Sequence, residues 1–268
     1  MKKVVFIIFM FLFIFSSLAC SNKADIDDSV ITIGASVAPH AAILEVVRDE
    51  LLRQGYTLKI VEFTDYVLPN TSLQAKELDA NFFQHVPYLT FFNQSNNTDL
   101  VSVAAIHFEP FGIYKGTEQD LIDLPRKTKI AIPNDQSNRA RALLLLEAQG
   151  LLTIRSGAGL SASVNDITSN PLELEIIELE AAGIPARLAD VGLAVINGNY
   201  AISANVTSLL IVSELPTSLA ATTFANIIVV RRGDENKPAI LALISALKSE
   251  VVRSFILQNY PNAVYPVF

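Results

Sequence analysis

The chain has a single cysteine, Cys20, among its 268 residues, so it can form no intramolecular disulfide. Its stability must therefore come from a hydrophobic core. The hydrophobic content of 51% is enough for a sizeable core, even after a leader is removed. A chain of this length forms either one large domain or two ordinary ones.

Runs of basic residues, and alternation of basic with aromatic residues, are also missing. The chain has 20 Lys and Arg against 27 Asp and Glu, which gives a formal net charge of −7. A protein that binds nucleic acid needs a basic surface to meet the phosphates. We therefore expect no nucleic-acid partner.

The motifs of common enzyme classes are absent as well. The sequence has no nucleophile elbow, no glycine-rich phosphate loop and no paired catalytic carboxylates. Glutamates do recur near residue 175, but they alternate with Leu and Ile and are typical of a solvated strand face: Glu173, Glu175, Glu178 and Glu180. We expect a binding protein without a cofactor rather than an enzyme.

The N-terminus has the three parts of a secretory signal. Met1–Lys3 is positively charged, Val4–Phe15 is uninterrupted apolar sequence, and small residues lead to Cys20. The apolar run is shorter than the roughly 20 residues of a comfortable membrane span. We interpret 1–19 as a lipoprotein signal peptide, Cys20 as the lipidated residue and 20–29 as a tether. An uncleaved anchor and ordinary signal cleavage nearby remain open, because Leu18 lies one place later than in the usual lipobox.

A lipidated Cys20 would carry several acyl chains, enough for stable attachment to a membrane. The mature chain would then have no free thiol, which excludes cysteine catalysis. We expect the protein to be lipid-anchored at the cell membrane, facing the periplasm or the outside.

The rest of the chain alternates strands and helices in two sets. The first runs to Tyr114, and the second begins at Asp120. This order is typical of α/β lobes with mostly parallel sheets. We predict a two-lobed, periplasmic-binding-protein-like clamshell whose lobes are joined by two crossing strands at a hinge. Residues 30–112 plus 226–268 would form lobe 1, and 113–225 would form lobe 2, with a ligand site in the cleft.

The stretch Asp79–Leu89 is unusually rich in aromatic and amide side chains. It follows neither a period of two nor a period of 3.6, so we interpret it as a short strand that runs into a loop. Such a loop suits a small-molecule pocket. On this stretch alone, a buried strand end with one hydrogen-bonded histidine explains the pattern equally well.

Arg141 follows closely on a strand-to-helix turn at Pro133–Asn138. A helix start carries free N–H groups and a partial positive charge. A guanidinium there could hold a carboxylate through two parallel hydrogen bonds. Arg139 should point to a different face of the helix and be an ordinary surface residue.

Six segments in order resemble the methionine-binding lipoproteins of the MetQ/NlpA-type family, the substrate-binding components of methionine ABC importers. They span nearly the whole mature chain: Phe63–Asn70, Leu78–Leu89, Ile130–Asp135, Arg141–Leu146, Leu193–Asn197 and Ala225–Arg231. The resemblance implies capture of methionine and delivery to a permease and its ATPase, by a protein we expect to be a monomer. The chain departs from the family pattern at Glu77, Lys115, Gln136-Ser137 and Arg139.

The resemblance also implies the residues of the pocket. Arg141 would hold the carboxylate, and the amides of Asn197 and Asn226 could donate to a carboxylate or accept from an ammonium group. The aromatic wall, suited to a thioether, would be formed by Tyr66, Phe83, His85 and Tyr88.

Three alternatives stay open. The pocket could take a methionine-containing dipeptide or another apolar amino acid, or the protein could be a lipoprotein without a ligand. The chain's three histidines, His40, His85 and His107, could instead bind a divalent metal with Glu109 as a fourth ligand. Their spacings carry no motif, and Arg141 would repel a cation. We expect His40 to be structural or solvent-facing and His107 to be a hydrogen-bonded core residue.

Overall fold

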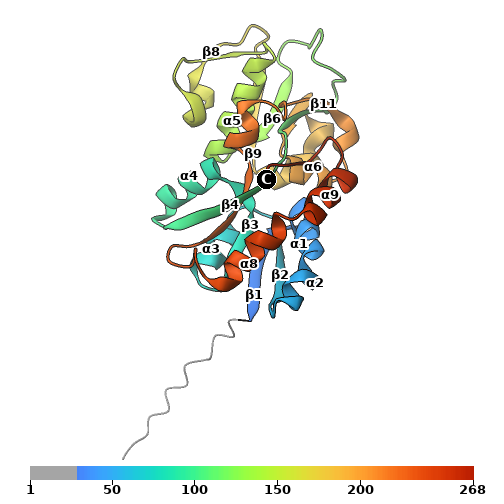
Figure 1. Ribbon diagram of the computed structural model, residues 1–268. Helices are drawn as coiled ribbons and strands as arrows, with labels where there is room; N and C mark the ends of the chain where they lie inside the picture. Colours follow the sequence, from blue (N-terminus) through green and yellow to red (C-terminus); the bar gives the residue numbers. More distant parts are fainter. Residues whose placement is uncertain (1–28) are drawn as a thin grey trace, which may run out of the picture.

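The computed structural model describes residues 29–268. The predicted signal peptide, Cys20 and almost all of the predicted tether lie outside the described residues. Two separate sheets organise the rest, one in each half of an elongated molecule (Figure 1). Within residues 29–268, every helix is too short or too polar to cross a bilayer.

The first sheet has the strand order β13-β4-β12-β3-β1-β2. Its parallel part is β1, β2 and β3, and β12 runs antiparallel between β3 and β4. The strand bounds are β1 (Val30–Ser36), β2 (Thr57–Phe63), β3 (Ala80–His85), β4 (Leu100–Phe108), β12 (Asn226–Arg231) and β13 (Tyr265–Pro266).

Helices cover both faces of this sheet, because its central strands are apolar on both sides. In β12, Ile228 and Val230 belong to one core cluster, and Ile227 and Val229 belong to another. The first cluster packs under α1 (Ala42–Val46), α2 (Arg48–Arg53), α8 (Pro238–Leu247) and α9 (Glu250–Asn259). The second packs under α3 (Leu68–Gln74) and α4 (Val86–Asn96).

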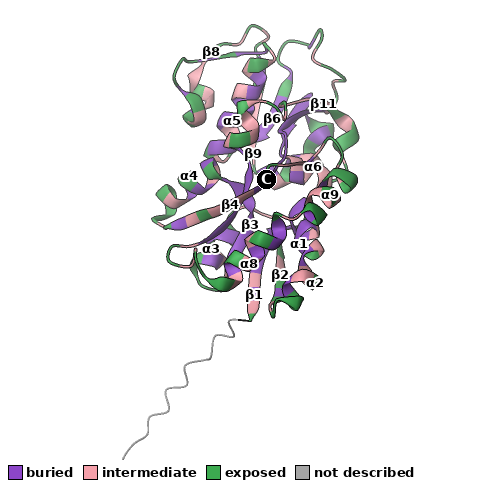
Figure 2. Cartoon of the chain, viewed as in Figure 1, coloured by how far each residue is buried: buried purple, intermediate pink, exposed green. Residues whose placement is uncertain are grey.

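The second sheet has the order β11-β5-β10-β6-β9 and the same two-sided burial. Its bounds are β5 (Gly112–Lys115), β6 (Lys129–Pro133), β9 (Glu175–Leu179), β10 (Leu193–Ile196) and β11 (Leu210–Ser213). Leu193 and Val195 face the cluster under α5 (Gln136–Ala148), whereas Ala194 and Ile196 face the cluster with α6 (Gly198–Ser203). A small hairpin, β7 (Thr153–Ile154) with β8 (Ile167–Ser169), extends this half. Figure 2 shows the buried residues concentrated in the two sheets.

Short 3₁₀ and π helices complete the connections of both halves. They are η1 (Val37–Ala41), η2 (Gly159–Ser161), η3 (Val164–Asp166), η4 (Ala181–Gly183), η5 (Pro185–Asp190) and η6 (Thr207–Leu209).

The chain passes between the two sheets twice. Glu109–Phe111 connect β4 to β5, and residues 214–225, which include α7 (Leu219–Thr223), connect β11 to β12. The mixed α/β architecture agrees with the predicted clamshell. The division into 30–112 plus 226–268 and 113–225 stays our proposal for the domain boundaries.

One local prediction was wrong. The segment after β3 is the helix α4 rather than a loop. The aromatic segment hides the helical period because α4 is covered on more than one side. The last helical segment of the chain is divided into α8 and α9, because the Ser249 side chain accepts a hydrogen bond from the Val252 N–H and starts a new helix.

Candidate functional site

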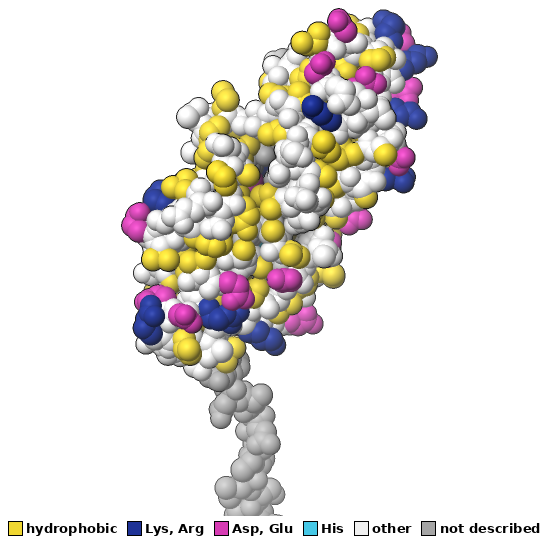
Figure 3. Space-filling view, turned by 90° about the vertical axis from the view of Figure 1, so that its right-hand side faces the viewer, with side chains coloured by type: hydrophobic (Ala, Val, Ile, Leu, Met, Phe, Trp, Pro, Cys, Tyr) yellow, Lys and Arg dark blue, Asp and Glu magenta, His cyan; other side chains and the backbone are white. Residues whose placement is uncertain are grey.

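A small cavity of about 20 Å³ lies between the two sheets, and all seven predicted pocket residues line it. On one face of the molecule, Figure 3 shows a recess between the two halves, with most Lys, Arg, Asp and Glu lying away from it. The lining residues are Tyr66, Phe83, Gln84, His85, Tyr88, Glu109, Asn138, Arg141, Asn197, Gly198, Asn199 and Asn226.

Strand ends and helix starts bring these side chains together. His85 ends β3, Asn197 directly follows β10, and Asn226 begins β12. In the sheet register, Asn226 lies opposite His85 on one side and His107 on the other. The carboxyl ends of parallel strands meet at one sheet edge, which is where α/β folds place ligands.

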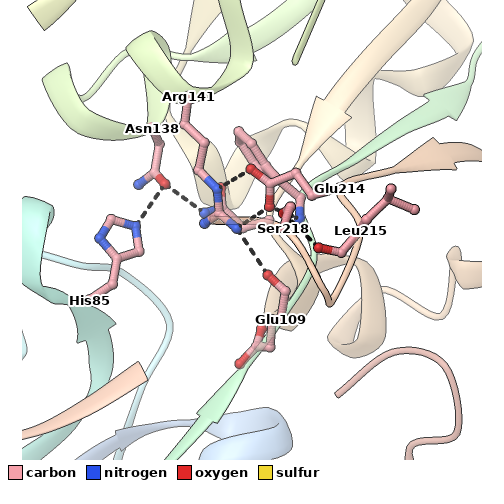
Figure 4. A network of polar contacts seen from close by, with 9 residues as sticks. His85, Glu109, Asn138, Arg141, Glu214, Leu215 and Ser218 are labelled. Carbon is pink, nitrogen blue, oxygen red and sulfur yellow. Dashed lines mark hydrogen bonds and ion pairs between the residues drawn. The ribbon is translucent and has the colours of Figure 1, made fainter. Parts of the chain in front are cut away.

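Arg141 is 4% exposed and already has a partner. Its Nε and Nη2 donate to the two carboxylate oxygens of Glu214, at 2.8 and 2.5 Å, and Nη2 also donates to the Glu109 carbonyl at 3.1 Å (Figure 4). The Phe224 ring lies 4.1 Å from the guanidinium carbon. In this structure Nε and Nη2 of Arg141 hold Glu214, and Nη1 makes no hydrogen bond among the described residues. The role of Arg141 in holding a ligand carboxylate stays a prediction.

Asn138 connects the two halves of the molecule. Burial, with a contribution from the charge of Arg141, lowers the pKa of His85 to about 3, so the ring is neutral. Its Nδ1 accepts from the Tyr88 N–H at 3.2 Å, and Nε2 therefore carries the proton and donates to Asn138 Oδ1 at 3.2 Å. Asn197 Nδ2 donates to the same oxygen at 3.1 Å.

The orientation of the Asn138 amide follows from its other end. Its Nδ2 donates to both carboxylate oxygens of Asp135, the residue that caps α5. The spacing from Asp135 to Asn138, an N-cap residue and the third helical position, is the sequence signal that could have identified Asn138.

The aromatic wall is present. Tyr66 lies 5.7 Å from both Phe83 and Tyr88 by ring centroids, and Phe83 lies 5.9 Å from Tyr88. Tyr66 donates its hydroxyl to Asn199 Oδ1 at 2.6 Å, across the cavity. Burial raises the pKa values of Tyr66 and Tyr88 above the usual tyrosine range, so both hydroxyls remain neutral donors.

Asn197 and Asn199 each have a buried polar atom without a partner. Asn197 Oδ1 and Asn199 Nδ2 make no hydrogen bond within the described part of the chain, although both residues line the cavity. An unpaired buried polar group costs about 1–3 kcal/mol, so such groups usually meet a ligand or water. The cavity thus presents both an acceptor and a donor to whatever fills it. Sequence reasoning found Asn197 but not Asn199.

Glu109 supplies the carboxylate among the lining residues, and Gly198 lets it approach. A Cβ on Gly198 would lie 2.8 Å from the Glu109 Cβ and 3.0 Å from Oε2, so only glycine fits there. Burial raises the pKa of Glu109, while His40 and Arg141 favour the ionised form. The sequence suggests Glu109 only as a metal ligand, whereas the structure places it in the cavity lining.

The three histidines do not form one metal-binding cluster. His40, His107 and Glu109 converge, with their ligand atoms within 4.8 Å of one another, but His85 lies outside this group. His40 and His107 are both fully buried, and neither faces solvent. Their Nε2 atoms lie 3.4 and 2.7 Å from Glu109 Oε1.

Tautomer chemistry argues against a metal in this group. Both Nδ1 atoms lack a partner within residues 29–268. A metal on the Nε2 atoms would move both protons to Nδ1, whereas metal-binding histidines donate that second proton to an oxygen. Without a metal, both Nε2–H groups can donate to nearby oxygens. Burial lowers the pKa values of His40 to about 4 and of His107 to about 3, so both rings are neutral.

Arg139 is partly buried rather than an exposed surface residue, and Nη1 donates to Glu178 at 3.2 Å. This ion pair connects α5 to β9 away from the cavity. Of the two arginines in the helix, only Arg141 lines the site.

Comparison with known proteins identifies the family. The NlpA lipoprotein family model matches residues 31–268. Membrane lipoprotein TpN32 from Treponema pallidum is 40% identical over 91% of this chain and 89% of its own length. The structure of a nutrient binding protein from Burkholderia cenocepacia bound to methionine has a TM-score of 0.84 and 39% identity, and it covers 89% of this chain and 100% of that one.

A third relative is described by its transport role. The structure of an ABC transporter, periplasmic substrate-binding protein from Coxiella burnetii has a TM-score of 0.83 and 37% identity, covering 88% of this chain and 100% of the other. The family match spans nearly all the described residues, and these relatives are similar over most of their length. The chain therefore belongs to the NlpA lipoprotein family.

Proposed function

We propose that the protein captures methionine outside the cytoplasm and delivers it to an ABC importer. The observation that carries this proposal is a pair of unpaired polar groups on one cavity: Asn197 Oδ1 can accept from an ammonium group, and Asn199 Nδ2 can donate to a carboxylate. Arg141 also lines the cavity, and its Nη1 remains available as a second donor to the carboxylate because only Nε and Nη2 hold described residues. A free amino acid carries both charged groups on one carbon.

The aromatic wall supports an apolar side chain on that amino acid. Tyr66, Phe83 and Tyr88 surround one side of the cavity with ring edges and faces. Thioether sulfur packs favourably about 5 Å from aromatic rings. The small volume favours a single amino acid over a dipeptide, which is the alternative ligand of this pocket. No group in the set resembles a catalytic nucleophile beside a base, so we propose binding rather than an enzymatic reaction.

Calorimetry with L-methionine, D-methionine and a methionine-containing dipeptide tests the ligand, after native mass spectrometry of freshly purified protein. Arg141→Ala and Asn226→Ala should each weaken binding by more than 1 kcal/mol, because a buried ligand group would lose its partner. Arg139→Ala is the matched control on the same helix. Unchanged affinity in both site variants would refute the assignment of these residues.

We further propose that Cys20 is lipidated and holds the protein at the cell membrane as a monomer, where it meets a permease and its ATPase. The lipoprotein family and the leader sequence support the anchor. Labelling of cells with radioactive palmitate should mark the wild-type protein and leave Cys20→Ser unlabelled. Equal labelling of both would reject this attachment site.

A further inference from the structure

We infer that His40 is a positioning residue for ligand recognition, although it does not line the cavity. It holds the side-chain amide of Asn226 in one orientation, with the Nδ2 donor turned to the ligand. The inference rests on the proposed function and adds to it a determinant of specificity for a free carboxylate.

His40 Nε2 lies between two side-chain oxygens. This nitrogen lies 2.9 Å from Asn226 Oδ1 and 3.4 Å from Glu109 Oε1. A lone pair on Nε2 would be repelled by the Glu109 carboxylate oxygen on one side and by Asn226 Oδ1 on the other. Nε2 therefore carries the proton and donates it to Asn226, for which only the oxygen end of the amide can accept.

The competing tautomer is the less favourable one. His40 Nδ1 makes no well-formed hydrogen bond to any described residue, and the Ala38 carbonyl is at best a weak acceptor for it. A proton on Nδ1 would gain little there and would leave the lone pair of Nε2 facing the Asn226 and Glu109 oxygens.

Packing keeps the His40 ring in place. It meets Phe82 edge-on with centroids 4.7 Å apart and lies 4.9 Å from the His107 ring. All three rings are fully buried in the first sheet's core. A rotation of the imidazole would require these neighbours to move, so the donor points at Asn226 in a fixed direction.

Asn226 transmits this orientation to the cavity. Its Oδ1 is held by His40, and its Nδ2 makes no hydrogen bond to any described residue, while Asn226 itself lines the cavity. An amide that could turn over would offer either a donor or an acceptor to the ligand. The fixed amide offers only a donor, which suits a carboxylate and disfavours a ligand whose own N–H points there.

The first experiment compares two substitutions of His40 by calorimetry with L-methionine. His40→Gln keeps a side-chain N–H near the position of Nε2, and His40→Met keeps the volume but removes the donor. We expect about tenfold weaker binding for His40→Met and recovery to within about threefold of wild type for His40→Gln. The preference for L-methionine over L-methioninamide should fall in His40→Met alone.

A double-mutant cycle separates positioning from a general effect on the fold. If His40 acts through Asn226, then His40→Met should weaken binding no further in a protein that already carries Asn226→Ala. Losses that add in full, or equal losses in His40→Gln and His40→Met, would overturn the inference.

Asn226→Asp provides a test that does not depend on how His40 variants fold. His40 would still donate to one oxygen, and the second oxygen would present a negative charge to the ligand carboxylate. We expect loss of L-methionine binding greater than in Asn226→Ala; binding that is retained or strengthened would mean that Oδ1 faces the ligand and would overturn the inference. A wild-type protein that binds no amino acid would instead reject the proposed function itself.

Discussion

Closure of the two halves over a ligand should depend on one hydrogen bond between tyrosine and asparagine. Tyr66, in the connection between β2 and α3, donates its hydroxyl to Asn199 Oδ1 in the other half at 2.6 Å. Asn199 is only 3% exposed, and its Nδ2 has no partner within the described residues. Tyr66→Phe removes the donor and leaves the whole Asn199 amide unpaired, with almost no change in shape.

The expected loss of affinity follows from comparing the open form of the protein with the closed form. When the halves are apart, water can satisfy both groups, so the substitution costs little there. When they are together, the lost bond and the stranded carbonyl should cost about 1–2 kcal/mol, within the usual range for a buried unsatisfied acceptor. Because the ligand binds the closed form, the dissociation constant should rise roughly 5- to 30-fold.

Tyr200→Phe is the matched control, because Tyr200 also donates across the halves. Its hydroxyl lies 3.2 Å from the Thr64 carbonyl in a solvent-exposed position, where water can replace the lost donor. We expect a loss below about 0.5 kcal/mol. Calorimetry with methionine gives both affinities, and small-angle scattering follows closure. Equal effects of the two substitutions, or no effect of Tyr66→Phe, would refute the reasoning.

Two further predictions concern the cavity floor and the buried histidines. Gly198→Ala should push Glu109 aside and weaken methionine binding about tenfold in calorimetry, since the new Cβ would lie 2.8 Å from the Glu109 Cβ; wild-type affinity would contradict this contact. Burial lowers the pKa values of His40, His85 and His107 to about 3 to 4 in the folded protein, below the ordinary 6.5. At pH values between the folded and the ordinary pKa, the unfolded chain therefore binds more protons than the folded chain. The free energy of unfolding should therefore fall from pH 7.5 to pH 5, by roughly 1–2 kcal/mol per histidine. Urea titrations at the two pH values measure it, and a flat profile would contradict their burial as neutral rings.

Much of the fold could be predicted because it depends on local patterns. Alternating strands and helices, with apolar residues on both faces of strands such as Leu193–Ile196, are readable within a short window. The start of α5 was also readable, since Asp135 is a good N-cap residue and Arg141 must then lie near the helix start. The segment Val86–Asn96 was misread because its aromatic residues contact neighbours on several sides, which hides the helical period.

Local patterns along the chain are sufficient to predict the two-set α/β order, the residue types of the pocket and the family to which they point. How those residues pair depends on the three-dimensional arrangement. Arg141 meets Glu214, 73 positions away, and His40 meets Asn226, 186 positions away. Such contacts depend on how two separately packed sheets are placed against each other, which no local pattern contains. The same placement makes Asn138 the link between the halves. It also places His85 beside Asn138, whereas His40 and His107 lie beside Glu109.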